Sequence, residues 1–591
     1  MAAEVPAKLK GGEFLITASD PQDVFTPEDF TEEHQMIAQT AQQFMEQEVL
    51  PQCEQLENQD LDLTVALLRK AAAELDLLAI DVPEKYEGLG LDKPSSTIVA
   101  EKLSRVGSFA ISYGAHCGIG TLPIVYFGTE AQKQQYLPKL AKGELLAAYA
   151  LTEATSGSDA LAAKSTAVLS EDKKSWILNG EKLWITNAGF ADLFIVFAKV
   201  DGKDFSAFIV ERKFEGVKLG AEEKKMGIKG SSTRILLLEE ARVPVENLLG
   251  EQGKGHKIAL NILNIGRYKL GAGCVGAAKA AIGDSLSYAT ERQQFGRPIA
   301  EFGAIQEKLA EMAIRTWIAE SMAYRTVGLI DARLREVDAD DPGQALKAIE
   351  EYAVECSIVK VWCTEMLDFV VDEAVQIFGG NGYSQEYPVE RYYRDSRINR
   401  IFEGTNEINR LLITGMLLRR AKKGELALMQ ATEQIFSELT SFPEELDPEE
   451  KLAEEKRIVE NAKKATLMVA GLASQKYGEA LTDEQEIVMA AADMIMEVHG
   501  MESGLLRVLK IAQKGSKDLE LYEKLIRCYI HDAIDKISLS GKKILGSVCE
   551  GDEQRTYLAA LRKFCKHSLL NSIPMRRDIA GALLKAQEYN L

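Results

Sequence analysis

The segment from Gln376 to Glu407, QIFGGNGYSQEYPVERYYRDSRINRIFEGTNE, decides how the rest of the chain is interpreted. Its glycine-rich run at 379–382 allows a backbone to approach a ligand closely, because glycine has no Cβ. Glu403 follows two bulky apolar residues and precedes Gly404. It is therefore a candidate for a desolvated turn, in which a carboxylate becomes a stronger base. For Glu403 taken alone, an ordinary surface glutamate is the alternative interpretation.

Helical patterns lie on both sides of a β-rich region upstream of this segment. Apolar residues recur with helical spacing over residues 31–148 and again from about residue 255 to about residue 420. Between them, short runs such as LFIVFAKV and FSAFIVER are separated by turn residues. Because no helical pattern interrupts these runs, we predict an antiparallel β-domain, built as a sandwich or barrel rather than as a parallel sheet.

The stretch SFPEELDPEEKLAEE is rich in proline and acidic residues, which is typical of a linker, and helical patterns follow it. We therefore predict an α+β chain of several domains. Its expected parts are an N-terminal extension (1–30), a helical domain (31–148), a middle β-domain (149–254), a second helical domain with the candidate base (255–424), a linker (425–450) and an additional helical domain (451–591).

Composition narrows the class of function. The net charge of −20 disfavours binding to nucleic acid, because an acidic surface repels a phosphodiester backbone. The eight Cys are scattered and predict reduced core thiols in an intracellular protein. The six His form no pair at metal-binding spacing, so we expect no metal site.

The N-terminus carries no recognisable targeting signal. It lacks an apolar core, Glu4 comes early and the first arginine is Arg69, so we expect neither a secretory nor a mitochondrial leader and predict a cytoplasmic, bacterial-type protein. The longest apolar runs are far too short to span a membrane, and any membrane contact would be peripheral.

Three further segments contain residues whose types are not explained by core packing alone. Residues 151–159 form a run of hydroxyl, small and acidic residues, which offers donors to a polar ring or a phosphate; a polar helix-capping turn is the alternative. Asn179-Gly180 indicates a hairpin turn. After it, Trp184 and Thr186 alternate with Ile185 and share one face of a strand, where an aromatic ring beside a hydroxyl would flank a flavin; a core tryptophan is the alternative.

The third segment, Arg292 to Arg297, follows a long helical pattern and contains Phe295. Arginine beside an aromatic ring suits a diphosphate and an adenine, and a solvated helix end is the equal alternative. Each of the four segments is a weak signal by itself. Their joint order and separation are far more specific.

Together the four segments resemble the acyl-CoA dehydrogenase family over about residues 30–420. The phrases EKKMGIKGSSTR, ILNIGR and RIFEGTNEI, with the extra helical tail, are most similar to its very-long-chain branch, which includes a complex I assembly relative. The resemblance implies an acyl-CoA dehydrogenase-like fold, in which the second helical domain is a four-helix bundle, with FAD as the cofactor. Where the family often has Pro-Gly-Ala, this chain has Ala154-Thr155-Ser156.

The resemblance also implies cofactor contacts. Residues expected to line the flavin and the substrate are Tyr149, Leu151, Thr152, Gly157 and Ser158, and those expected beside the flavin are Trp184 and Thr186. Residues expected to reach the FAD of a neighbouring protomer, and hence to require a homodimer, are Arg292, Phe295, Gln376, Gly379 and Gly380. Thr405 and Glu407 are expected near the adenosine pyrophosphate.

By the same resemblance, Glu403 is the catalytic base that takes the substrate α-proton. Some relatives carry this carboxylate on the helix that precedes the matched Arg267, but the position here is Gly266. Residues expected at the acyl-CoA substrate are Gly114, Ala115, Ser158, Leu263, Asn264, Arg267 and Gly404. The small side chains at 114 and 115 predict an open channel for a long acyl chain; helix packing is the alternative.

The function expected from the resemblance is FAD-dependent oxidation of long-chain acyl-CoA to trans-2-enoyl-CoA in fatty-acid β-oxidation. Electrons would pass to an electron-transferring flavoprotein. Two alternatives are an assembly or scaffold protein on a dehydrogenase fold and a flavin oxidase or monooxygenase of the same fold. The tail at 451–591 is expected to replace the second dimer of tetrameric relatives and is a candidate for peripheral membrane contact.

Overall fold

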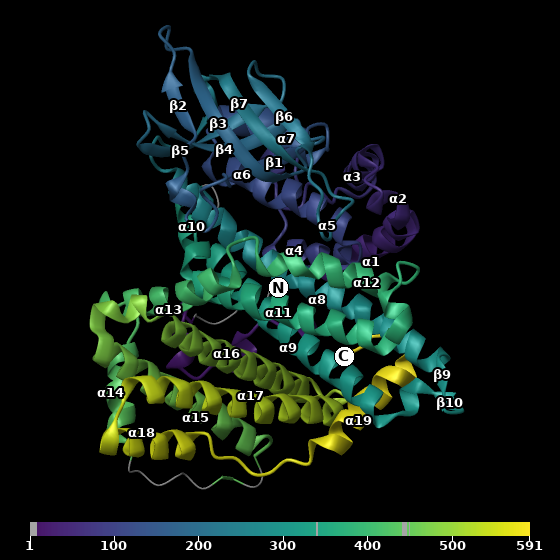
Figure 1. Ribbon diagram of the computed structural model, residues 1–591, viewed down its shortest axis with the longest axis vertical. Helices are drawn as coiled ribbons and strands as arrows, with labels where there is room; N and C mark the ends of the chain where they lie inside the picture. Colours follow the sequence, from purple (N-terminus) through teal and green to yellow (C-terminus); the bar gives the residue numbers. More distant parts are fainter. Residues whose placement is uncertain (1–8, 339–340, 440–445, 448–449) are drawn as a thin grey trace.

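The structure is a computed structural model that describes residues 9–338, 341–439, 446–447 and 450–591 (Figure 1). The start of the predicted N-terminal extension, residues 1–8, and part of the predicted linker therefore lie outside the described residues. The β-domain lies at one end of the molecule, the long helices of the second helical domain cross its middle, and the C-terminal helices lie at the other end (Figure 1). The α+β architecture predicted from the sequence is confirmed.

The first helical domain is built from short helices that begin at polar caps. Thr31, Asp60, Asp92 and Thr129 each accept a hydrogen bond from a backbone N–H in the first turn of the helix that follows. Pro51 lies in the short helix at Leu50–Gln52, which follows the π-helical turn at Met45–Val49 directly, and Pro83 immediately precedes the short helix at Glu84–Tyr86. The helices are α1 (Glu32–Phe44), α2 (Cys53–Glu57), α3 (Leu61–Leu75), α4 (Lys93–Lys102), α5 (Gly107–Gly114), α6 (Leu122–Phe127) and α7 (Glu130–Ala141). A π-helical turn, η8 (Ala115–Gly120), joins α5 to α6.

The middle domain is one sheet, with strand order β6-β7-β3-β2-β4-β5-β8 and β1 paired to β4. Most neighbours are antiparallel, as predicted, but β1 and β2 both pair with β4 in parallel. Its strands are β1 (Ala147–Ala150), β2 (Thr166–Leu169), β3 (Ser175–Thr186), β4 (Leu193–Val200), β5 (Asp204–Glu211), β6 (Val217–Glu222), β7 (Thr233–Pro244) and β8 (Leu248–Leu249). The alternation of buried and exposed residues along β3 places one of its faces in the core of this domain.

The hairpin turn predicted at Asn179-Gly180 is wrong. Strand β3 continues through both residues, and β7 pairs with it on either side, with Leu178 opposite Ala241 and Gly180 opposite Leu238. The change of register between these pairs is a β-bulge, in which Gly180 has φ 151°. The partner strand therefore overrides the local turn preference of an Asn-Gly pair.

The second helical domain rests on four long helices: α8 (Gly255–Glu291), α9 (Gly303–Leu334), α11 (Ala353–Phe378) and α13 (Asn406–Lys422). Shorter helices, α10 (Pro342–Glu351) and α12 (Pro388–Ser396), join them. Between α8 and α9 the chain forms a small hairpin of β9 (Gln293–Gln294) and β10 (Arg297–Pro298). Helices α8, α9 and α11 pack against one another along their length, and α13 packs on α11. This arrangement brings the candidate base, just before α13, over the first half of α8.

The tail contains α15 (Ala453–Tyr477), α16 (Gln485–Lys514), α17 (Leu519–Val548), α18 (Gly551–Phe564) and α19 (Ser572–Ala586). These helices share one hydrophobic core with α8, α9 and α11, so the tail is not an independent body. Helix α14 (Leu428–Ser437) occupies the first part of the predicted linker, which is therefore partly helical. Residues 440–445 and 448–449 of that linker lie outside the described residues.

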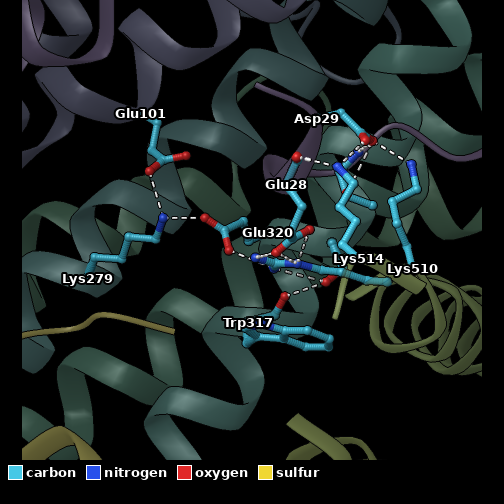
Figure 2. A network of polar contacts seen from close by, with 11 residues as sticks. Glu28, Asp29, Glu101, Lys279, Trp317, Glu320, Lys510 and Lys514 are labelled. Carbon is cyan, nitrogen blue, oxygen red and sulfur yellow. Dashed lines mark hydrogen bonds and ion pairs between the residues drawn. The ribbon is translucent and has the colours of Figure 1, made fainter. Parts of the chain in front are cut away.

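A buried ionic network ties the tail and the N-terminal segment to the rest of the molecule (Figure 2). The Arg507 guanidinium of α16 lies 2.8 Å from Glu28 and 2.7 Å from Glu320 of α9, and it stacks over the Trp317 ring. Lys279 of α8 joins Glu320 to Glu101 of α4. Four parts of the sequence are thus held through charges, of which Glu101, Glu320 and Arg507 are buried and Glu28 and Lys279 are partly buried.

The eight Cys side chains are all buried free thiols, as the sequence predicts. Among the described residues, the helices are all too short or too polar to cross a membrane.

Candidate active site

Glu403 lies in a strained turn immediately before α13. Its φ is 56° and that of Gly404 is 82°, so both residues adopt the left-handed conformation that most side chains avoid. Three side chains hold the carbonyl groups of this turn. Arg267 Nε donates to the Glu403 carbonyl at 3.2 Å, whereas Lys360 Nζ and Asn409 Nδ2 donate to the Gly404 carbonyl at 2.7 and 2.8 Å. Backbone strain that is held in this way is a feature of functional sites.

The pKa of the Glu403 carboxyl group lies near neutral pH. Its Oε2 is buried without a hydrogen-bond partner among the described residues. Burial raises the pKa of Glu403 to about 7, because a carboxylate removed from water is disfavoured relative to the acid; nearby Arg267 and Lys360 oppose this rise. A carboxylate with this pKa and a free oxygen is suited to accept a proton from a weak carbon acid.

Gly266 lies directly beneath this carboxylate. A Cβ placed on Gly266 would come within 2.8 Å of Glu403 Oε2 and 3.0 Å of its Cδ. The absence of a side chain on α8 therefore makes the room that the Glu403 side chain fills. This contact gives a physical reason for the glycine that the sequence places at 266.

Residues of α8 form another wall of the site. Arg267 is buried and Nη1 donates to Asn264 Oδ1 at 3.0 Å, which holds the guanidinium under the Glu403 turn. Leu263 and Gly266, three residues apart on one face of the helix, are only partly buried. The structure thus brings Arg267, with Asn264 bonded to it, Gly266 and Gly404 together around Glu403; the assignment of Asn264, Arg267 and Gly404 to the substrate stays a prediction.

Tyr149, on β1, is the site's second group with an unpartnered polar atom. Its hydroxyl is buried without a hydrogen-bond partner among the described residues, and its ring packs on Phe197. Burial holds the pKa of Tyr149 well above its usual value, and the nearby Glu403 carboxylate raises it further. Tyr149 therefore lies close enough to Glu403 for the two groups to interact electrostatically.

The loop after β1 leaves its small residues open. A Cβ at Gly157 would meet no atom within 4 Å, and Ser158 is exposed. Glu153 fastens the loop through a buried ion pair of 2.6 Å with Lys182, and the Ser156 hydroxyl donates to the carbonyls of Asp159 and Ala160. The sequence difference at 154–156 is therefore accommodated by a hydroxyl that closes the loop. Leu151 is buried beside it, and the Thr152 carbonyl accepts the Leu183 N–H at 2.8 Å.

Trp184 does not behave as a core residue. Its side chain is 58% exposed, whereas that of Ile185 is 2% exposed, so the predicted division between the two faces of β3 is confirmed. Trp184 has φ 60° at a second change of register with β7, which is an unusual conformation for a bulky residue. An indole held in the open by a strained strand is available to cover a planar ligand, with the half-buried Thr186 on the same face.

The Arg292 and Gln376 segments lie together, but far from Glu403 in the same chain. The Tyr288 hydroxyl donates to the Phe378 carbonyl, and Asn381 donates to that hydroxyl, so the hairpin after α8 adjoins the glycine turn after α11. Gly266 and Arg292 stand near opposite ends of the unbroken helix α8, which separates them by about 40 Å at 1.5 Å per residue.

The exposed groups at this distant end are shaped for a ligand or a partner. Phe295, at the tip of the hairpin, has φ 53° and is 93% exposed. A Cβ at Gly379 or Gly380 would meet no atom within 4 Å. Arg292 and Gln376 are exposed as well. These residues do not contribute to the Glu403 site of their own chain, and their assignment to a neighbour's cofactor stays a prediction.

Two further predicted contacts have local structural roles. Thr405 caps α13 by accepting a hydrogen bond from the Ile408 N–H at 3.3 Å, and Glu407 is exposed in the first turn. In the first helical domain, Gly114 is exposed and Gly118 is buried, yet a Cβ on either would meet no atom within 4 Å. Ala115 between them is buried. Open space beside two helical glycines is what an acyl channel requires.

Sequence reasoning missed Lys360 and Asn409, both of which hold the Glu403 turn. The signal for Lys360 was present, because it is the one charged residue within the apolar run SIVKVWC at 357–363.

Comparison with known proteins decides the family. Four domain profiles match: "Acyl-CoA dehydrogenase, N-terminal domain" at 31–144, the middle domain at 148–241, and two described as "Acyl-CoA dehydrogenase, C-terminal domain" at 253–418 and 461–563. A probable acyl-CoA dehydrogenase of Bacillus subtilis is 52% identical over 100% of both chains. The chain belongs to the acyl-CoA dehydrogenase family.

Other members of the family match different shares of this chain. A crystal structure of an acyl-CoA dehydrogenase complexed with FAD from Bacillus anthracis has 54% identity and a TM-score of 0.97, and the match covers 99% of this chain and 100% of that one. The very long-chain specific acyl-CoA dehydrogenase of Rattus norvegicus is 43% identical, over 58% of this chain and 51% of that protein. Likeness to the mitochondrial enzyme thus spans about half of its length, whereas the bacterial relatives match throughout, tail included.

Proposed function

We propose that this protein oxidises long-chain acyl-CoA to trans-2-enoyl-CoA with FAD as its cofactor and Glu403 as its base. One observation supports this above all. Glu403 Oε2 is buried and unpartnered, on a carboxylate whose pKa burial raises to about 7. In a protein that served only as a scaffold, such a strained and unpaired acid would lower stability without benefit.

Exposed residues of the middle β-domain fit a flavin. The exposed Trp184 indole, the half-buried Thr186 hydroxyl and the open backbone at Gly157 offer a flat surface with polar donors. The FAD-bound relative from Bacillus anthracis, at 54% identity, supports the same cofactor here. When bound, FAD supplies the two-electron acceptor for the hydride that leaves the substrate β-carbon.

The protein's own groups perform the proton transfer. Glu403 Oε2 takes a proton from the α-carbon of the thioester, so an α C–H bond breaks and the carboxylate becomes a carboxylic acid. Arg267 and Lys360 hold the carbonyls of the Glu403 turn and thereby fix the direction of the carboxylate. Burial also excludes water, which would otherwise compete as the proton donor. Loss of the α-proton and the β-hydride leaves the trans double bond of an enoyl-CoA.

The open space beside Gly114 and Gly118 supports a long acyl chain, because no side chain blocks the helix surface there. The separation of about 40 Å along α8 supports a homodimer, since the Arg292 and Gln376 segments are too far away to serve their own chain's Glu403 site. We also propose an electron-transferring flavoprotein as acceptor, cytoplasmic β-oxidation as the setting, and peripheral contact of the tail with membranes.

Anaerobic titration of the purified FAD-loaded protein with acyl-CoAs from butyryl to palmitoyl tests the proposal. We expect bleaching of the flavin absorbance with the largest kcat/KM for long chains, followed by recovery on addition of electron-transferring flavoprotein. Glu403→Gln, loaded equally with FAD, is the matched control and should bleach far more slowly. A wild-type protein that holds FAD but bleaches with no acyl-CoA would refute the proposed function. Rapid recovery in oxygen alone would instead indicate an oxidase.

A further inference from the structure

Lys360 is a buried cation without a buried anion directly paired to it. Its side chain is 0% exposed in the middle of α11, and among the described residues no Asp or Glu forms an ion pair with it. Nζ instead donates to the Gly404 carbonyl and to Asn406 Oδ1, each at 2.7 Å. A buried ammonium held only by neutral acceptors is destabilising, so its presence calls for a reason beyond packing.

The groups that Lys360 faces belong to the base turn. Its ammonium donates a hydrogen bond to the carbonyl of Gly404, the residue after Glu403, and Asn409 donates to the same carbonyl. Burial lowers the pKa of Lys360 to about 8, and the Glu403 carboxylate is the strongest of the groups that raise it back. Lys360 in turn lowers the pKa of Glu403. The two residues thus act on each other electrostatically without direct contact.

Few other charges reach this place. Arg267 of α8 also contacts the Glu403 turn and is likewise buried; its hydrogen bonds among the described residues go to the Glu403 carbonyl and to Asn264. The titratable or charged groups that face Glu403 or Lys360 are Arg267 and Cys274 of α8, Glu365 of α11, Glu407 of α13 and Tyr149 of β1. Of these, only Arg267 shares with Lys360 a positive charge that stabilises the Glu403 carboxylate.

We propose that Lys360 is a positioning residue for the dehydrogenation: it fixes the left-handed turn that aims Glu403, and its positive charge favours the ionised form of Glu403 before the substrate binds. The inference rests on the proposed function, in which Glu403 is the base. Arg267 anchors the carbonyl of Glu403 itself and Lys360 that of the next residue, so two cations from two helices hold consecutive peptide groups. Loss of either would free the strained turn and remove a positive charge from the carboxylate.

Lys360→Met tests the charge and the hydrogen bonds together, because methionine keeps a long unbranched side chain. We expect the acid limb of the pH profile of kcat/KM to move to higher pH by about 1 unit, since loss of a nearby opposite charge raises the pKa of a carboxylate by about that amount. We also expect kcat to fall at every pH. Lys360→Arg retains the charge and should restore the acid limb while kcat stays reduced, because a planar guanidinium cannot reproduce the ammonium geometry.

Thr364→Val is the matched control. Thr364 lies one turn along α11, is buried, and also hydrogen-bonds Asn406, at 3.1 Å, but carries no charge. This variant removes a contact of the same network and should leave the acid limb where it is in the wild type. If Thr364→Val moves the limb as far as Lys360→Met does, packing and not charge sets it, and the inference is overturned.

A second measurement does not depend on turnover. Infrared difference spectra across a pH titration report the C=O stretch of protonated Glu403, identified as the band absent from Glu403→Gln. In Lys360→Met, or in Lys360→Gln if the methionine variant fails to fold, this band should persist to higher pH than in the wild type. An unmoved band overturns the inference. Because the band is read without substrate, this result stands apart from failure of the proposed function, which a wild-type protein unable to bleach would reveal.

Discussion

Replacement of Glu403 by Gln removes a proton acceptor and almost nothing else. Gln is close to Glu in size, so the space over Gly266 stays filled and the Arg267 bond to the backbone carbonyl is retained. A positioned general base contributes about 10²–10⁴-fold, and the neighbouring position 266 offers no replacement carboxylate, so dehydrogenation should fall by about 10⁴-fold. The flavin should remain bound.

The same substitution has an effect on stability that follows from the pKa. Burial raises the pKa of Glu403 from an ordinary 4.5 to about 7, so the folded state binds this proton more tightly than the unfolded state. Below pH 4.5 the carboxyl is protonated in both states and does not affect the free energy of unfolding. Above pH 7 it is ionised in both states, and its burial lowers the free energy of unfolding by the full cost of the pKa shift. At 1.36 kcal/mol per pKa unit, that amount is about 3 kcal/mol. Glu403→Gln should be more stable than the wild type at pH 8 by up to this value, and no more stable at pH 4.

Two assays check these results. Stopped-flow bleaching with saturating palmitoyl-CoA measures the chemical step, and urea unfolding of wild-type and variant protein at pH 4 and 8 measures the stability difference. A variant that bleaches at more than a tenth of the wild-type rate would refute Glu403 as the base. A stability difference that is equal at the two pH values would refute the assignment of a raised pKa to a buried Glu403.

Three other substitutions probe separate parts of the molecule. Gly118→Leu should fill the open space beside its helix, so kcat/KM for palmitoyl-CoA should drop at least tenfold while that for butyryl-CoA is kept; equal losses would place the acyl chain elsewhere. Arg507→Met should destabilise the protein by about 1.5–3 kcal/mol, seen in urea unfolding, because the partly buried Glu28 and the buried Glu320 would each lose a charged hydrogen-bond partner; an unchanged midpoint would show that the network is dispensable. Arg292→Ala should weaken FAD retention in gel filtration at least tenfold without unfolding the chain, since Arg292 is exposed; full retention would argue against its role in a shared cofactor site.

Much of the fold could be predicted from the sequence, because helices and strands place apolar residues at regular spacings. Helical spacing of apolar residues and short β-rich runs identified two helical domains around a β-domain, and both features follow from which face of each element is buried. The linker was predicted from composition alone, and composition did not reveal the helix at Leu428–Ser437, whose apolar residues pack on the core of the tail. The prediction of a hairpin turn at Asn179-Gly180 was wrong for a similar reason. The pairing of β7 with both halves of β3 outweighs the local preference of an Asn-Gly pair for a turn.

The sequence by itself determined the family and the candidate base, because the order and spacing of several short segments are specific even where each segment is weak. Only the tertiary structure decided what makes Glu403 a base. Removal from water raises its pKa, the open face of Gly266 makes room for the side chain, and cations of two other helices limit the rise; none of these residues is near Glu403 in the chain. Lys360 stands 43 residues before Glu403 in the sequence but holds the adjacent carbonyl in space. Electrostatic effects depend on distance and burial, and neither can be read from a sequence before the chain is folded.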